Sequence, residues 1–200
     1  FADLDNDGFK DLFVTNGTRR DINTKDYFKK IGERYSGLEH DKIDILSVIN
    51  GIPSEKIENY AFKNNQDLTF SNVGDSWGLN HKGFSNGTAY ADLDNDGDLD
   101  LVVSNIDETI LLYKNTANDQ DGTNYLQIKL EGESNNSSGI GAKITMYQQG
   151  ELQFQEVMLS RGFQSSISSI VHFGLGSKPI IDSLLVIWPG GNVQKLTDVK

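Results

Sequence analysis

Short apolar segments, separated by turns rich in glycine, asparagine and serine, follow one another along the last third of this chain. Within several of them apolar and polar residues alternate, and no helical period is present. Such segments predict β-strands, and a run of them predicts a compact β-sandwich or barrel. The six predicted strands cover residues 125–130, 140–147, 152–159, 166–173, 181–188 and 193–197.

The first part of the chain is an internal repeat. Phe-Ala-Asp at residues 1–3 corresponds to Tyr-Ala-Asp at residues 90–92, and Phe-Lys-Asn at residues 62–64 corresponds to Tyr-Lys-Asn at residues 113–115. The first copy is longer by roughly 38 residues, which fall between Asn16 and Tyr60. Repeats of this kind predict stacked supersecondary units, with insertions placed in loops on one face.

The insertion has a helical period. A first helix is predicted with Asn23 or Thr24 as its N-cap and Gly37 as its stop, and a second helix from about residue 41 to residue 49. Their apolar faces consist of Tyr27, Phe28, Ile31 and Tyr35, and of Ile43, Leu46 and Ile49. We expect these faces to pack the insertion onto its own repeat, and a recognition surface is the alternative.

Two acidic stretches share one spacing. Residues 92–100 read Asp-Leu-Asp-Asn-Asp-Gly-Asp-Leu-Asp, and residues 3–11 read Asp-Leu-Asp-Asn-Asp-Gly-Phe-Lys-Asp. Both have Asp at positions 1, 3, 5 and 9 and Gly at position 6, as in the first nine residues of a calcium loop, where position 7 contributes its backbone carbonyl. The predicted ligands are Asp92, Asp94, Asp96, the carbonyl of Asp98 and Asp100 in one loop, and Asp3, Asp5, Asp7, the carbonyl of Phe9 and Asp11 in the other.

The chemistry of these loops predicts two bound calcium ions. Carboxylates held close together repel one another unless a cation compensates them, and oxygen-only ligands favour calcium or magnesium over zinc or copper. A solvated acidic turn is the alternative, but two matches at one spacing favour a metal site. Position 12 is Val14 or Val103 instead of the glutamate of an EF-hand.

Apolar β-type segments flank both loops, and Tyr-Ala-Asp-Leu-Asp-Asn-Asp-Gly at residues 90–97 resembles the FG-GAP/VCBS calcium repeat. The resemblance implies an all-β fold in which residues 1–118 form a partial β-propeller of two blades, with the helical insertion at about residues 19–57. Two blades do not close a ring. Their exposed edges are therefore expected to be covered by the insertion, by the C-terminal domain or through self-association with another copy.

The composition changes at residues 115–124, which predicts a domain boundary and a second domain at residues 119–200. This segment contains the motifs Asn124-Tyr125-Leu126, Gly139-Ile140-Gly141-Ala142, Arg161-Gly162-Phe163-Gln164-Ser165-Ser166, His172-Phe173-Gly174-Leu175-Gly176 and Trp188-Pro189-Gly190-Gly191. These motifs resemble the ASPIC/UnbV domain, and the combination with FG-GAP/VCBS repeats implies a bacterial member of the cartilage acidic protein-like family.

Charge and composition narrow the partners. The net charge is −11, and because residues 126–200 are balanced, all of it lies in the first 125 residues. Two divalent cations would leave a net charge of about −7, so no nucleic-acid partner is expected.

The chain has no cysteine, which excludes disulfides and thiolate chemistry. The longest apolar run, residues 184–188, predicts no membrane span. The chain begins at what should be the end of a strand, so we expect a fragment whose signal sequence lies elsewhere.

No catalytic constellation is evident. His40, His81 and His172 are far apart in the sequence, and we expect His172 to be a bonded structural histidine. The predicted function is a calcium-stabilised binding or adhesion module, secreted or on the cell surface in a periplasmic or extracellular location, that recognises an extracellular protein or glycan. The alternative is a propeller-based hydrolase or lyase that acts on polysaccharide. Loops of this composition should bind calcium at about 10⁻⁴ to 10⁻³ M, as extracellular modules do.

Overall fold

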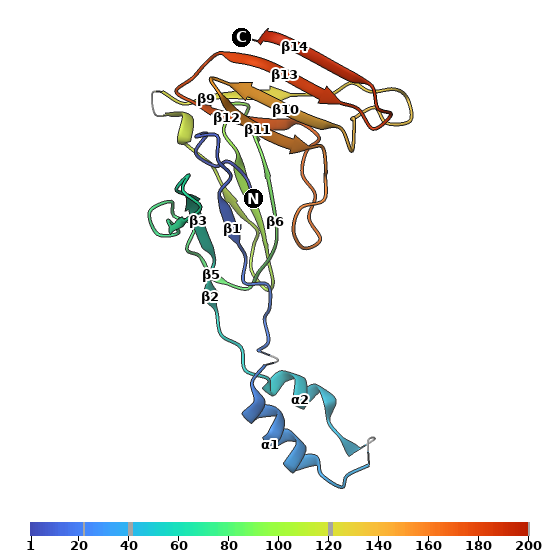
Figure 1. The fold of residues 1–200 in the computed structure, drawn as a ribbon. Coiled ribbons are helices and arrows are strands. Elements are labelled where there is room, and N and C mark those ends of the chain that lie inside the picture. Colours follow the sequence, from blue (N-terminus) through green and yellow to red (C-terminus); the bar gives the residue numbers. More distant parts are fainter. Residues whose placement is uncertain (22, 40–41, 120–121, 200) are drawn as a thin grey trace.

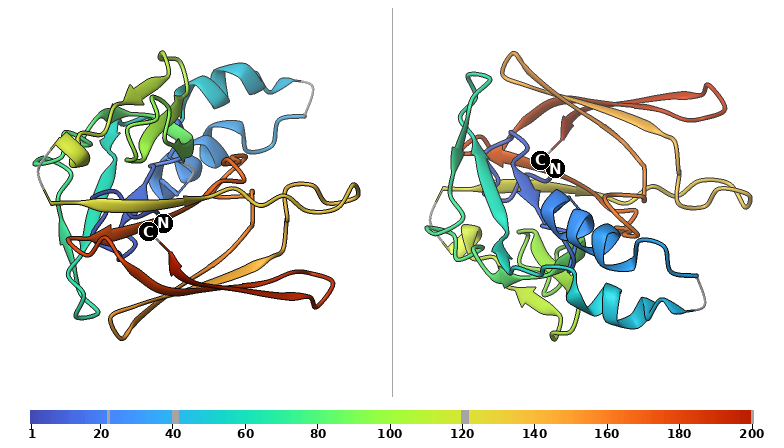
Figure 2. Two further views of the ribbon diagram at one scale, coloured as in Figure 1. Left: turned by 90° about the horizontal axis from the view of Figure 1, so that it is seen from above. Right: turned by 90° about the horizontal axis from the view of Figure 1, so that it is seen from below.

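The computed structural model describes residues 1–21, 23–39, 42–119 and 122–199. Most elements are β-strands, so the predicted all-β class is confirmed. Figure 1 shows the C-terminal sheets at one end of the molecule, the strands of the first part in the middle and a helical hairpin at the other end. Figure 2 shows the same order from both ends, with the hairpin nearest the viewer when the molecule is seen from below.

Two antiparallel sheets of three strands form the middle of the molecule, in the orders β1-β3-β4 and β6-β7-β8. The first sheet pairs Leu12 with Phe62. The second pairs Leu101 with Tyr113, the equivalent positions of the repeat. The bounds are β1 (Leu12–Val14), β3 (Tyr60–Asn64), β4 (Phe70–Asn72), β6 (Ser85–Ala91), β7 (Asp100–Asn105) and β8 (Leu111–Tyr113), with β2 (Ile57–Glu58) and β5 (Lys82–Gly83) as a separate pair. The internal repeat is therefore visible in the strand register.

These sheets do not make a ring. The strands in the described ranges form neither a closed barrel nor a circle of blades. One small core lies between the two sheets, formed by Ala2, Leu4, Ala61, Leu79, Leu99 and Leu101. The propeller arrangement therefore stays a prediction.

The insertion contains both expected helices, α1 (Lys25–Tyr35) and α2 (Ile45–Gly51). The second begins later than predicted, with the Asp44 side chain accepting a hydrogen bond from the Ser47 amide, while Asp41 lies outside the described residues. Gly37 follows α1 with a φ of 79°, a left-handed conformation that suits glycine at a helix end.

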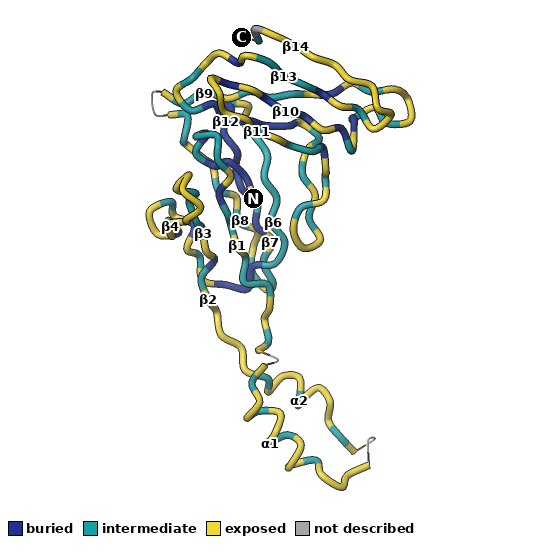
Figure 3. The backbone as a smooth tube through the Cα atoms, viewed as in Figure 1, coloured by how far each residue is buried: buried dark blue, intermediate teal, exposed yellow. Residues whose placement is uncertain are grey.

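The expected packing of this insertion on its own repeat is wrong. Neither helix contains a buried residue, and Figures 1 and 3 show the hairpin projecting beyond the strands. The helices contact each other, since the Tyr27 hydroxyl donates to the Val48 carbonyl at 2.5 Å. Leu46 remains 72% exposed. The physical reason is that the connecting segments carry the hairpin past the ends of the sheets, so only its inner surface is shielded.

All six strands predicted after residue 124 are present. They are β9 (Asn124–Ile128), β10 (Lys143–Gln148), β11 (Glu151–Glu156), β12 (Val171–Gly176), β13 (Ile181–Ile187) and β14 (Val193–Val199). The orders are β11-β10-β13-β14 in one sheet and β12-β9 in the other. β12 starts five residues later than predicted, because residues 157–170 leave the sheet as a long loop.

The two C-terminal sheets enclose a core of their own. Ile144 and Met146 of β10 and Leu184 of β13 belong to the same buried cluster as Phe173 of β12. That cluster shares no residue with the core of the first part. No helix in the described part of the chain is both long and apolar enough to cross a membrane. The two acidic loops lie where the two parts meet, one directly before β1 and the other between β6 and β7 (Figure 1).

Candidate metal centre

The structure gathers the predicted ligands into two clusters. In the first loop, one oxygen from each of Asp3, Asp5 and Asp11 lies within 4.8 Å of the others. In the second loop the same holds for Asp92, Asp94 and Asp96. Two oxygens that share a calcium ion at 2.3–2.6 Å are at most about 5 Å apart, so both clusters have the spacing of a common cation site.

Position 1 of each loop is held by the same hydrogen bonds. The Asp3 carboxylate accepts from the amides of Asp7 at 3.1 Å and Gly8 at 2.9 Å. The Asp92 carboxylate accepts from the amides at the same two positions of the second loop, at 3.2 and 3.1 Å. This turn needs a left-handed residue at position 6, where Gly8 has a φ of 96° and Gly97 a φ of 90°. The spacing of aspartate and glycine thus produces one geometry twice.

The aspartate at position 9 accepts one hydrogen bond from its own loop and one from the chain at or just after the end of a strand in the same sheet. Asp11 accepts from the amides of Leu4 and Asn64, both at 3.0 Å. Asp100 accepts from the amide of Leu93 at 3.0 Å and from that of Asn115 at 2.8 Å. Because a carboxylate has about four lone-pair sites, these bonds orient the group and leave acceptor capacity for a cation.

The clusters do not contain every predicted carboxylate. Asp7 lies outside the first and Asp100 outside the second, although both belong to their loops. One Asp7 oxygen accepts from the Phe9 amide at 2.9 Å, and one Asp96 oxygen accepts from the Asp98 amide at 3.2 Å. These bonds involve the peptides before the two predicted carbonyl ligands. The two loops therefore match in backbone and differ in which carboxylates meet.

The side chain of Asp98 points to a partner outside its loop. It is fully buried, and one of its oxygens accepts from the Asn118 amide at 3.2 Å. Burial raises the pKa of Asp98 to about 6, and the neighbouring Asp96 contributes in the same direction. Its other oxygen, Oδ1, is buried and has no hydrogen-bond partner among the described residues, so the contribution of this position through its carbonyl alone stays a prediction.

The electrostatics of the first loop favour a bound cation. Burial raises the pKa of Asp3 to about 7 and that of Asp11 to about 6, with smaller contributions from the neighbouring aspartates. The Oδ1 atom of Asp5 is buried and has no hydrogen-bond partner among the described residues. An unpartnered buried carboxylate oxygen within an all-oxygen donor set fits a hard divalent cation.

One lysine contacts the carboxylates of each loop and brings a positive charge close to them. The Lys63 ammonium contacts the carboxylates of Asp5 and Asp7, the latter at 3.2 Å. Lys114 occupies the equivalent position and contacts Asp94 at 2.5 Å and Asp96 at 3.5 Å. This hydrogen bond from Lys114 lowers the pKa of Asp94. The repeat pattern pairs the two lysines in the sequence, but nothing in that pattern predicts that they reach the loops.

We expect the substitutions Lys63→Met and Lys114→Met each to strengthen calcium binding to the adjacent loop by about two- to fivefold, because the ammonium competes for the same carboxylates and exposed ion pairs are weak. Calorimetric titration with calcium measures the change. Lys82→Met is the matched control, because Lys82 pairs with Glu58 at 3.0 Å away from both loops. Unchanged or weaker binding in both variants would contradict a competing role for the lysines.

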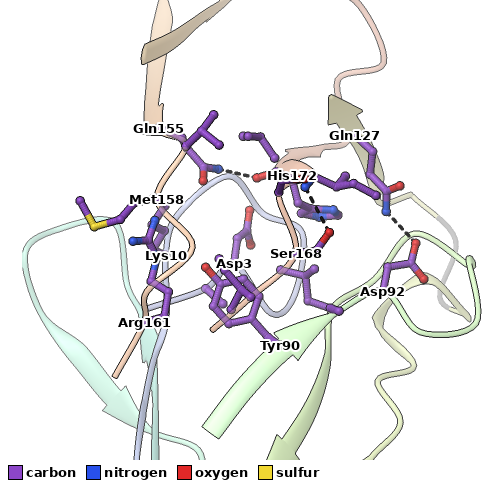
Figure 4. A pocket seen from close by; sticks show the side chains of 18 of the residues that line it. Asp3, Lys10, Tyr90, Asp92, Gln127, Gln155, Met158, Arg161, Ser168 and His172 are labelled. Carbon is purple, nitrogen blue, oxygen red and sulfur yellow. Dashed lines mark hydrogen bonds between the residues drawn. The ribbon is translucent and has the colours of Figure 1, made fainter. Parts of the chain in front are cut away.

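Both loops contact the C-terminal strands directly. The His172 Nε2 atom of β12 lies 2.6 Å from the Asn6 side-chain oxygen, and the Gly176 amide donates to the Asn6 carbonyl at 2.8 Å. In the second loop the Gln127 side chain of β9 donates to the Asp92 carboxylate at 2.6 Å (Figure 4). The loops therefore lie against the sheet β9-β12.

His172 is the expected bonded structural histidine. Burial lowers its pKa to about 4, although the Asp92 charge acts in the opposite direction. The ring is therefore neutral near pH 7, and Nε2 donates its proton to Asn6. The ring also stacks on Tyr125, with centroids 5.8 Å apart. His81 pairs with Glu108 at 2.9 Å, and His40 lies outside the described residues.

Sequence reasoning missed this contact between the loops and the C-terminal part. Asn6 and His172 are 166 residues apart, and no local pattern connects them. One signal was available, since Gly174 interrupts an apolar strand, and glycine within a strand often marks a close backbone approach.

One known protein family matches the C-terminal part of the chain. The family described as ASPIC and UnbV matches residues 132–200, which include strands β10 to β14. No curated protein matches the chain. The match covers the segment in which the sequence analysis found most of its ASPIC/UnbV markers, and it does not extend to the acidic loops. Residues 132–200 of this protein are therefore similar to the ASPIC and UnbV family.

Proposed function

We propose that this protein is a calcium-stabilised extracellular binding module. The observation that carries the proposal is the shared backbone geometry of two acidic loops, each with a carboxylate cluster within 4.8 Å. We further propose that residues 1–118 are two FG-GAP/VCBS blades of a β-propeller, with Asp3, Asp5, Asp7 and Asp11 holding one ion and Asp92, Asp94, Asp96 and Asp100 the other. The carbonyls of Phe9 and Asp98 complete the ligand sets.

In this proposal the ion has a structural role. A bound calcium ion compensates the mutual repulsion of the aspartates. The residues of the chain then hold the loops in a fixed shape against the C-terminal strands through Asn6, His172 and Gln127. Calcium thus favours one arrangement of the two parts, as a ligand that binds only the folded state does.

The proposed partners are an extracellular protein or a glycan, and the proposed location is secreted or on the cell surface. The modest calcium affinity expected of these loops fits this location, because millimolar calcium is present outside the cell. The excess of negative charge disfavours nucleic acids. Self-association is also proposed, through strands β4 and β8, each of which ends its sheet.

Calorimetric titration of metal-free protein tests the proposal. We expect calcium to bind with a Kd of about 10⁻⁴ to 10⁻³ M. Magnesium should bind more weakly, because it demands near-octahedral geometry and gives up its waters reluctantly. Absence of calcium binding would contradict the proposed function, and submicromolar affinity would contradict the extracellular assignment.

A further inference from the structure

A cavity of about 110 Å³ lies where the two acidic loops meet the C-terminal strands (Figure 4). Asp3 and Asp92, position 1 of each loop, line it from one part of the molecule, and Gln127 and His172 line it from the other. Pockets for drug-sized ligands measure about 300–1,000 Å³. This cavity therefore has room for one compact group at the end of a larger molecule.

Two cationic side chains line the same cavity. Figure 4 shows Lys10 and Arg161 next to each other on one wall. In the described part of the chain neither makes an ion pair with an acidic residue, and Arg161 donates only to the carbonyl of its neighbour Ser160, at 3.2 Å. Lys10 is exposed and Arg161 is partly exposed, so both are accessible. Adjacent cations without a partner favour an anion, and the planar guanidinium suits a carboxylate or sulfate.

The charge of this cavity depends on the loops. Three acidic side chains line it, those of Asp3, Asp92 and Glu156, against the two basic ones. Without metal the acids exceed the bases. Calcium in both loops adds four positive charges beside Asp3 and Asp92, so the cavity becomes less negative. Anion binding at this place should therefore require filled loops.

The remaining polar lining suits hydroxyl groups. Side chains that both donate and accept hydrogen bonds also line the cavity, namely Asn95, Gln155, Ser168 and Ser169. Such groups match the hydroxyls of a sugar ring. The other lining residues are mostly apolar, among them Leu99, Met158 and Ile170, and can contact the hydrocarbon face of a single terminal ring.

We propose that this cavity binds the carboxylate or sulfate group of an acidic saccharide, and that it does so only when the loops hold calcium. The inference rests on the proposed function, because the bound calcium offsets part of the negative charge of the acidic side chains that line the cavity. Arg161 is the main contact for the anion, and Lys10 adds charge beside it.

Saturation-transfer NMR with the full chain tests this inference. The probes are glucuronate, glucose 6-sulfate and neutral glucose, each in millimolar calcium and in EDTA. We expect a signal from one or both anionic sugars in calcium, which identifies carboxylate or sulfate, and none in EDTA or from glucose. Arg161→Gln should weaken binding about tenfold, as expected for the loss of one charge-assisted hydrogen bond. Arg161→Lys should retain part of it.

The control is Lys195→Gln, which removes the same charge from β14, away from the cavity. It should bind like the wild-type protein. Equal binding by wild type and Arg161→Gln, or binding that persists in EDTA, would overturn the inference while calcium still raises the melting temperature. Equal binding of N-acetylglutamate would overturn the assignment to a saccharide. If calcium has no effect on melting, the proposed function itself fails.

Discussion

Calcium at 100 times its Kd should raise the melting temperature of this protein by about 11–22 °C over a sample in chelator when both sites fill. An ion that binds only the folded state adds RT ln(1 + [L]/Kd), roughly 2.7 kcal/mol per site at that concentration. For a chain of this size each kcal/mol corresponds to about 2–4 °C. The clusters around Asp5 and Asp94 provide the binding sites. Thermal melts followed by circular dichroism measure the difference.

A variant of one loop separates the metal from general charge effects. Asp94→Ala should lose a large part of the calcium-dependent gain, because it removes a member of the second cluster. Glu133→Ala removes the same charge from an exposed turn and should keep the full gain. Melting curves that coincide in calcium and chelator would rule out structural calcium.

Substitution of Gly174 by alanine should destabilise the intact chain by about 1–3 kcal/mol, the usual cost of overpacking. A Cβ atom at Gly174 would lie 2.1 Å from the Asp3 carboxylate and 2.6 Å from the backbone of Asn6. The first loop would have to move away from β12, which breaks the contact between Asn6 and His172. We expect a melting temperature lower by about 2–12 °C, from 2–4 °C for each kcal/mol.

The matched control for this variant is Gly190→Ala. Gly190 lies in the same domain, its added Cβ would meet no atom within 4 Å, and its backbone is not left-handed. Its melting temperature should stay near that of the wild type. If Gly174→Ala melts like Gly190→Ala, the loop does not dock on β12 as the structure describes.

Those features that depend on local spacing were predictable from the sequence. The carboxylate clusters follow from aspartates at alternate positions and a glycine at position 6, all within nine residues. The six strands after residue 124 follow from short alternating segments between turns. Their core residues, such as Ile144 and Leu184, come from those segments.

Features that depend on distant parts of the chain were not predictable in this way. The amphipathic pattern around Tyr27 and Phe28 predicted a shielded face, but a pattern does not say what shields it, and here the second helix does so only in part. Likewise, the contact of Asn6 with His172 joins two parts that have separate cores. The repeat marker included Lys63 and Lys114, yet only the fold brings their ammonium groups to the carboxylates.

Counting bound ions tests the central claim most directly. Equilibrium dialysis at a calcium concentration well above the expected Kd, followed by elemental analysis, should find two calcium ions per wild-type chain. The variants Asp5→Ala/Asp7→Ala and Asp94→Ala/Asp96→Ala should each hold one, and the chain with all four substitutions none. Fewer than one ion per wild-type chain, or a count that none of the substitutions changes, would contradict two calcium sites in these loops.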